Sequence, residues 1–312
     1  MVYAAKFYLL AGLFLAALAP VLHAQVAVSA IDQSRLWQPP PAAPIPAVDT
    51  NGNAVGETTD VADDSFGAQM ILKDQERVRP FTLSGGSSIY YTSNVALTRR
   101  DTRDDVFAVV NAAGTWSRPL NPELGMQFGL QASMFRYNRE SQLDFNNLGA
   151  GLGLSWAPQS WSGVGIFGRY DFTELIDRHG NEILRDHQFS LGAQKVFVLG
   201  RAHAFSLGAL GSVGISTPSA AERNQVGIVA GYHLQLTRFL ATDLLYRIAG
   251  QSYNDSNRLD LNQVVSWNLR WRLAEWAEAN AYFSYGDNRS NTSVFDYKVS
   301  SGGGGFGITA RF

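Results

Sequence analysis

The last residues of the chain, SGGGGFGITARF at positions 301–312, decide the fold class. From position 306 the apolar residues occupy every second position: Phe306, Ile308, Ala310 and Phe312. This period of two predicts a β-strand with one apolar and one polar face. A transmembrane β-barrel can end on such a strand, because its last strand pairs with its first and its outer face meets lipid. The alternative is an edge strand of a soluble β-sandwich.

A terminal phenylalanine that follows apolar residues at alternate positions resembles the C-terminal signal that the outer-membrane assembly machinery of Gram-negative bacteria recognises. The resemblance implies that Phe306, Ile308, Ala310 and Phe312 form an assembly signal. It also implies a location in the bacterial outer membrane, with the barrel assembly machinery as a partner.

The composition of the 312 residues narrows the class of protein. Apolar residues make up 46% of the chain, yet beyond the first 25 residues no run of 18 apolar residues occurs, which excludes a helical membrane protein. Barrel strands escape such a search, because lipid-facing and lumen-facing residues alternate. A net charge of −2 offers no electrostatic basis for binding nucleic acid. The absence of cysteine excludes disulfides and thiolate metal sites, and we expect no cofactor and no metal.

The first 24 residues, MVYAAKFYLLAGLFLAALAPVLHA, predict a secretory signal peptide. Lys6 precedes an apolar stretch that runs to about Leu18, and Ala24 offers a small-residue cleavage site. Cleavage after Ala30 and an uncleaved anchor are the alternatives.

Residues 25–80 predict a Pro-rich and acidic periplasmic linker. They contain QPPPAAPIP at positions 38–46 and show no periodic apolar face, which favours extended, disordered backbone. The stretch 66–79, FGAQMILKDQERVR, predicts a short ordered segment at the barrel mouth or in the lumen. A periplasmic partner that docks on the prolines is the functional alternative for the linker.

Residues 81–312 predict the barrel itself. Stretches with alternating apolar residues recur there, separated by turn-forming residues. One of them has Met126, Phe128 and Leu130 on one face and Gln127 and Gln131 on the other. We therefore expect an all-β fold, a closed antiparallel transmembrane β-barrel of about twelve strands. The expected strands are 81–93, 104–117, 123–137, 144–157, 163–174, 186–198, 202–215, 224–237, 239–253, 258–272, 276–287 and 297–312.

The connections between these strands alternate in length, which supports the count. One set is short: 118–123, 158–162, 199–201, 238 and 273–275. The other set is longer and charged: 94–103, 138–143, 175–185, 216–223, 254–257 and 288–296. Short periplasmic turns and longer extracellular loops are typical of outer-membrane barrels, and an even strand count puts both ends of the barrel domain in the periplasm.

Aromatic residues are sorted in the same way. Tryptophans lie beside the predicted short turns: Trp116, Trp156, Trp161, Trp271 and Trp276. Tyrosines lie nearer the long loops: Tyr137, Tyr170, Tyr246, Tyr253 and Tyr285. Because amphipathic rings prefer membrane interfaces, this pattern predicts two girdles in contact with outer-membrane lipid and lipopolysaccharide.

The inner face of the predicted barrel combines glycine and charge. Twelve strands about 4.8 Å apart and tilted by about 40° enclose a cylinder roughly 24 Å across. Inward glycines gather on the fourth to eighth strands: Gly149, Gly151, Gly153, Gly165, Gly192, Gly208, Gly214, Gly227 and Gly231. The candidate constriction is charged and lines the lumen: Arg169, Asp171, Asp243, Arg247, Arg270 and Glu278. A thin wall facing a charged wall predicts an off-axis, water-filled passage. The alternative is an internal ion-pair ladder that plugs the lumen. Asp243 and Arg247 lie four residues apart on one predicted inward face, and we expect them to pair with each other and with Arg270 and Glu278 on the next two strands.

The predicted loop 175–185 and the residues after it place acids beside histidines: Asp177, His179, Glu182, Asp186 and His187. Such a group could activate a water molecule, so an outer-membrane hydrolase with a site in 175–187 is the enzymatic alternative. The motifs HEXXH and GXSXG are both missing. We expect no catalytic residues and no enzymatic activity.

Over residues 81–312 the chain resembles the outer-membrane β-barrel porin family of Gram-negative bacteria, some members of which accompany polysaccharide export. The resemblance rests on SSIYYTSNVALTRRDTRDDVF at 87–107, on the spacing of the strands and on the closing ITARF at 308–312. It implies a porin-like passive channel for small hydrophilic solutes, or a porin associated with polysaccharide export. A structural or docking barrel with a plugged lumen is the other interpretation.

Overall fold

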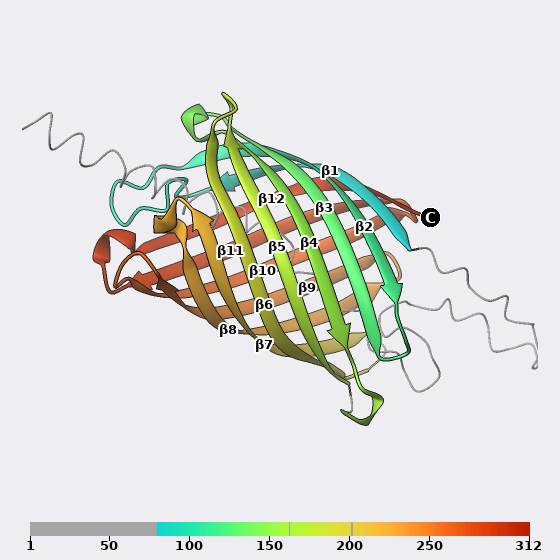
Figure 1. Cartoon of the computed structure of the whole chain (residues 1–312). Helices are drawn as coiled ribbons and strands as arrows, with labels where there is room; N and C mark the ends of the chain where they lie inside the picture. The colour runs from blue at the N-terminus through green and yellow to red at the C-terminus, as the bar shows by residue number, and fades with distance from the viewer. Residues whose placement is uncertain (1–79, 162, 201) are drawn as a thin grey trace, which may run out of the picture.

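The computed structural model describes residues 80–161, 163–200 and 202–312 (Figure 1). The expected signal peptide and, apart from residue 80, the expected linker with its segment 66–79 lie outside the described residues. The described part of the chain forms the strands β1 (Phe81–Thr92), β2 (Asp105–Pro119), β3 (Leu124–Tyr137), β4 (Phe145–Trp156), β5 (Val164–Asp177), β6 (Glu182–Val198), β7 (His203–Thr217), β8 (Arg223–Thr237), β9 (Leu240–Tyr253), β10 (Leu259–Ala274), β11 (Ala277–Ser290) and β12 (Tyr297–Arg311). Short 3-10 turns lie in the connections: η1 (Ser141–Leu143), η2 (Gln159–Trp161), η3 (Ser219–Ala221) and η4 (Ser293–Phe295).

The strands form one closed barrel, tilted around a common axis (Figure 1). Each strand is hydrogen-bonded to its neighbours in sequence, and β12 closes the ring against β1 with Thr92 opposite Ser301. At the other end of this seam, the backbones of Phe81 and Phe312 exchange hydrogen bonds of 3.3 and 2.9 Å. The prediction of a closed antiparallel barrel of twelve strands, with the last strand paired to the first, is therefore confirmed.

The outer surface of the barrel is apolar, as the alternation predicts. Leu83 on β1, Leu191 on β6 and Val226 on β8 are 54%, 67% and 72% exposed. The predicted outward set at the end of the chain lies on the same surface: Phe306, Ile308, Ala310 and Phe312. Among the described residues, no helix is long and apolar enough to cross a membrane. An apolar surface of this extent on a closed barrel is suited to contact with lipid.

Some strands run further toward the long-loop end than the sequence predicts. β5 and β6 continue through most of the expected loop 175–185 and leave only a turn at 178–181. Leu175 and Leu184 explain this, because they lie opposite each other and are fully buried inside the barrel. Asp177 closes the turn, since its carboxylate accepts hydrogen bonds from the backbone N–H groups of His179 and Asn181.

The aromatic girdles match the prediction at one end of the barrel. Trp156, Trp271 and Trp276 are 40%, 55% and 60% exposed at the short-turn end. At the long-loop end the prediction is wrong for Tyr137 and Tyr253, which point into the barrel and are 6% and 3% exposed. These two rings fill the lumen there and do not contact lipid.

Candidate functional site

The register of the strands decides which side chains line the lumen. Residues that alternate with the outward hydrophobic side chains point inward. The residues predicted for the constriction all lie on this inner face: Arg169, Asp171, Asp243, Arg247, Arg270 and Glu278. They occupy the barrel from the short-turn end to about its middle.

Asp243 on β9 is the centre of a charge cluster that spans three strands. Its Oδ1 lies 2.7 Å from Nδ1 of His233 on β8. Its Oδ2 accepts a hydrogen bond from Nε of Arg270 on β10 at 3.1 Å and lies 3.0 Å from Nη2 of the same guanidinium. The side chains of His233, Asp243 and Arg270 are 37%, 34% and 44% exposed. These groups therefore face water inside the barrel.

Asp243 is expected to pair with Arg247, four residues along its own strand, but its contacts are with His233 and Arg270. Residues four apart on one strand are separated by about 13 Å, whereas directly opposite residues on neighbouring strands are about 5 Å apart. His233 lies directly opposite Asp243 in the register of β8 and β9. Arg247 donates from Nη2 to Oδ1 of Asn262 on β10, at 3.1 Å.

Glu278 completes this side of the lumen, opposite Arg272 in the register of β10 and β11. The wall from β8 to β11 thus carries both signs of charge, as predicted. Its contacts are set by the register and not by spacing along one strand.

An ion pair on β5 faces this wall from the other side of the ring. Arg169 Nε lies 2.6 Å from Asp171 Oδ1. Gly151 on β4 provides the space, because a Cβ at this position would lie 2.9 Å from Asp171 Oδ1 and 3.3 Å from Arg169 Nη2. The side chains of the pair are 37% and 26% exposed.

The inward glycines form a thin wall only in part, which corrects the prediction. Side chains of neighbouring strands lie against several of them: Phe167 against Gly192, Gln131 against Gly149 and Ser206 against Gly231. Glycine is required there because inward side chains lean across the next strand. At Gly153 and Gly165 the position of a Cβ has no atom nearer than 4.0 Å, so the wall is thin at these two points.

An apolar cluster that was not predicted from the sequence fills part of the lumen at the long-loop end. Its members point inward from β2 to β6 and from β9, or come from the loops. This mouth cluster consists of Val95, Phe107, Val109, Phe135, Tyr137, Phe145, Leu175, Leu184, Ala221 and Tyr253. All of them are 9% exposed or less, and Phe135 stacks on Phe145 with ring centroids 4.4 Å apart.

The sequence does carry a signal for the mouth cluster. At the long-loop ends of the strands, apolar residues stand side by side and no longer alternate, as in Val106–Phe107 and Met134–Phe135. One residue of each pair faces lipid and the other faces the interior: Met134 is 47% exposed and Phe135 is 3% exposed. Adjacent apolar residues near a long loop therefore predict a filled lumen at that height.

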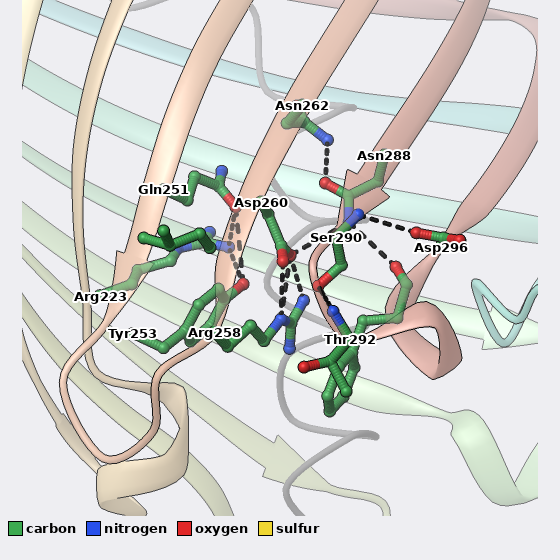
Figure 2. A network of polar contacts seen from close by, with 12 residues as sticks. Arg223, Gln251, Tyr253, Arg258, Asp260, Asn262, Asn288, Ser290, Thr292 and Asp296 are labelled. Carbon is green, nitrogen blue, oxygen red and sulfur yellow. Dashed lines mark hydrogen bonds and ion pairs between the residues drawn. The ribbon is translucent and has the colours of Figure 1, made fainter.

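A buried polar network fills the mouth between β8 and β12 (Figure 2). Arg258 and Asp260 form an ion pair whose side chains are 6% and 0% exposed. The Arg258 guanidinium lies 4.0 Å from the ring centroid of Tyr253 and 3.6 Å from that of Phe295. Asn288 adds a hydrogen bond to Asp260 Oδ2 at 3.0 Å. Charges this deeply buried need such partners, so the network belongs to the packed interior and not to a water-filled surface.

The acids and histidines of 175–187 do not converge on one point. Asp186 faces the lumen, where it accepts a hydrogen bond from Ser216 Oγ at 2.7 Å. Its neighbour His187 faces outward and lies 2.8 Å from the hydroxyl of Tyr170, while Asp177 closes a turn. Among the described residues, no group of three or more His, Cys, Asp or Glu side chains is arranged to hold a metal ion.

No protein-family model matches the chain, and no curated protein matches it. Solved structures with a similar fold include an outer-membrane channel from Pseudomonas putida F1, with 13% identity, a TM-score of 0.47, and coverage of 81% of this chain and 100% of that one. The translocator domain of the autotransporter NalP from Neisseria meningitidis has 9% identity and a TM-score of 0.41, covering 75% and 90%. The KdgM porin in complex with oligogalacturonate has 8% identity and a TM-score of 0.38, covering 72% and 98%.

The closed barrel and its apolar outer surface define the class of this protein. It is an outer-membrane β-barrel of porin-like architecture, located in the bacterial outer membrane. The resemblance to outer-membrane β-barrel porins is thus confirmed at the level of the fold.

Proposed function

We propose that the protein is a porin-like passive channel for small hydrophilic solutes, and that it is not an enzyme. The supporting observation is the exposed charge cluster inside the barrel, where His233, Asp243 and Arg270 are 34% to 44% exposed. Charges that served only to fill the lumen would be desolvated, as Arg258 and Asp260 are. The solvated cluster is therefore the candidate constriction of a water-filled passage.

The filled mouth at the long-loop end implies that this passage is closed in the present conformation. Opening would then be intermittent. The same mouth favours a second candidate function, a structural or docking barrel whose lumen stays plugged. A role in polysaccharide export is a narrower form of the first proposal, and it rests on the sequence resemblance.

The proposed binding partners follow from the barrel architecture. We propose that outer-membrane lipid and lipopolysaccharide contact the apolar outer surface, and that the barrel assembly machinery inserts the protein. A periplasmic partner would reach it through residues 25–80.

Planar-bilayer recording of the purified full-length protein tests the channel proposal. We expect discrete current steps separated by long closed periods. The control is a bilayer that received heat-denatured protein. If the folded protein carries no current at any applied voltage and passes no small sugar into proteoliposomes, the docking barrel is the better interpretation.

A further inference from the structure

We propose that the loop 93–104, between β1 and β2, is the gate of the extracellular mouth and that Asn94 is its latch. This inference rests on the proposed channel function. The loop is the longest connection between the described strands, and it enters the lumen at the long-loop end.

Two apolar residues of the loop anchor it to different parts of the mouth. Val95 is 2% exposed and belongs to the mouth cluster, whose other members come mainly from β2 to β6. Leu97 is 4% exposed and packs with Tyr297 and Val299 of β12. A loop residue can reach 2% exposure only where other groups enclose it, so Val95 occupies space between the side chains of the wall. The loop therefore packs into the mouth at two places.

Asn94 holds the loop in this position. It is 1% exposed, and its Nδ2 donates to the backbone oxygen of Lys298 on β12 at 3.0 Å and to that of Thr98 at 2.8 Å. Its Oδ1 accepts a hydrogen bond from the backbone N–H of Thr98 at 3.1 Å. One side chain thus ties the loop to the barrel wall and closes the loop on itself.

The backbone of the loop indicates that this position is imposed by contacts. Leu97 has a φ of 51°, in the left-handed region that a branched side chain seldom adopts. Its conformation persists because the surrounding structure determines it.

The outer contacts of the loop are weaker than the inner ones. Arg99 Nη1 lies 3.5 Å from Asp296 Oδ2, and Arg103 Nη1 lies 3.2 Å from Glu140 Oε1. The two arginine side chains are 52% and 66% exposed. Exposed ion pairs contribute little in salt water. The anchors and the latch, and not these surface pairs, therefore hold the loop in place in the mouth.

Asn94→Ala tests the latch in the full-length protein. It removes three hydrogen bonds, and because one such bond contributes about 1 kcal/mol net, we expect the open fraction in bilayer recordings to rise about tenfold or more. Asn291→Ala is the matched control. The side chain of Asn291 also joins a loop to neighbouring backbone, but it lies on the exposed rim. Its Nδ2 donates to the backbone oxygen of Asn257 at 2.6 Å, and its Oδ1 accepts from the backbone N–H of Leu259 at 3.0 Å. We expect the control to behave as the wild type does.

A reversible cross-link tests the gate independently of the latch. The chain has no cysteine, so in a Leu97→Cys, Val299→Cys variant the one disulfide that can form within the molecule joins the loop to β12. We expect the oxidised protein to carry no current and the reduced protein to recover it. Normal current in the oxidised protein, or an unchanged open fraction in Asn94→Ala, would overturn the proposal that this loop is the gate.

Labelling separates failure of the gate from failure of the channel. Gln188 faces the lumen, where it donates to Ser212 at 2.6 Å. A Gln188→Cys probe in intact cells should react faster with a membrane-impermeant maleimide when combined with Asn94→Ala than alone. Faster labelling in the Asn94→Ala background without any current would support the gate proposal and overturn the channel proposal. Equal labelling with and without Asn94→Ala would overturn the gate proposal even if the protein conducts.

Discussion

At the scale of the residue, the channel proposal predicts that Asp243 borders the path of a permeating ion. The interaction energy between one unit charge and an ion about 6 Å away in water is about 0.7 kcal/mol, which corresponds to about a threefold change in relative permeability. Asp243→Asn leaves the positive charge of Arg270 in place, so we expect a shift of about this size toward anions. Arg270→Gln should shift the selectivity toward cations. The measurement is the reversal potential in a KCl gradient, with Asp255→Asn, on the exposed rim, as the control.

Equal shifts of the same sign for both variants would show that the cluster does not border the passage. An Asp255→Asn effect as large as that of Asp243→Asn would point instead to the charge of the rim.

A second residue-scale prediction concerns glycine. A Cβ on Gly192 would lie 2.7 Å from the backbone oxygen of Ala209 and would overlap the ring of Phe167. Because a paired backbone can move aside only at a cost in free energy, we expect Gly192→Ala to lower the free energy of unfolding by about 1–3 kcal/mol. Gly168→Ala is the matched control, since a Cβ there has nothing within 4 Å. The midpoint of heat-induced unfolding, followed by gel mobility, checks this. Equal midpoints for the two variants would mean that the strands adjust without cost.

At the scale of the element, β12 carries the proposed assembly signal. Phe312→Ser should lower the amount of folded protein in the outer membrane several-fold, because the terminal aromatic residue of the signal is lost. The control is Phe239→Ser at a short turn of the same end. The two side chains are similarly exposed, at 60% and 47%. Heat-modifiable protein in membrane fractions is the measurement. A wild-type amount for Phe312→Ser would remove the signal role.

Most elements could be predicted from the sequence, because lipid and lumen impose a strict alternation on the middle of each strand. The alternation fails where both faces are apolar, and this is why Phe107, Phe135 and Leu175 were not predicted to fill the mouth. The contacts between side chains inside the barrel could not be predicted either, since they depend on the register of neighbouring strands. His233 became a partner of Asp243 only once β8 and β9 were aligned.

At the scale of the whole molecule, the remaining question is whether a barrel with a filled mouth is a channel or a hydrolase. A hydrolase must bring an acid, a base and its substrate to one point. Here Asp186 and His187 are neighbours on β6 and therefore point to opposite faces, one toward Ser216 in the lumen and the other toward Tyr170 on the outer surface. His179 lies in the exposed turn at 178–181.

We therefore expect the double variant His179→Ala, His187→Ala to fold as the wild type does and to conduct within about twofold of it, since neither side chain lines the lumen. The hydroxyl of Tyr170 loses one partner on the outer surface, which costs about 1 kcal/mol. Purified wild-type and variant proteins should be compared in bilayer current and in the hydrolysis of phospholipid, lipopolysaccharide and peptide. We expect no hydrolysis by either. Hydrolysis by the wild type that is lost in the double variant would place an active site at the rim, because only a catalytic role for these histidines explains such a loss in a barrel that still folds and conducts.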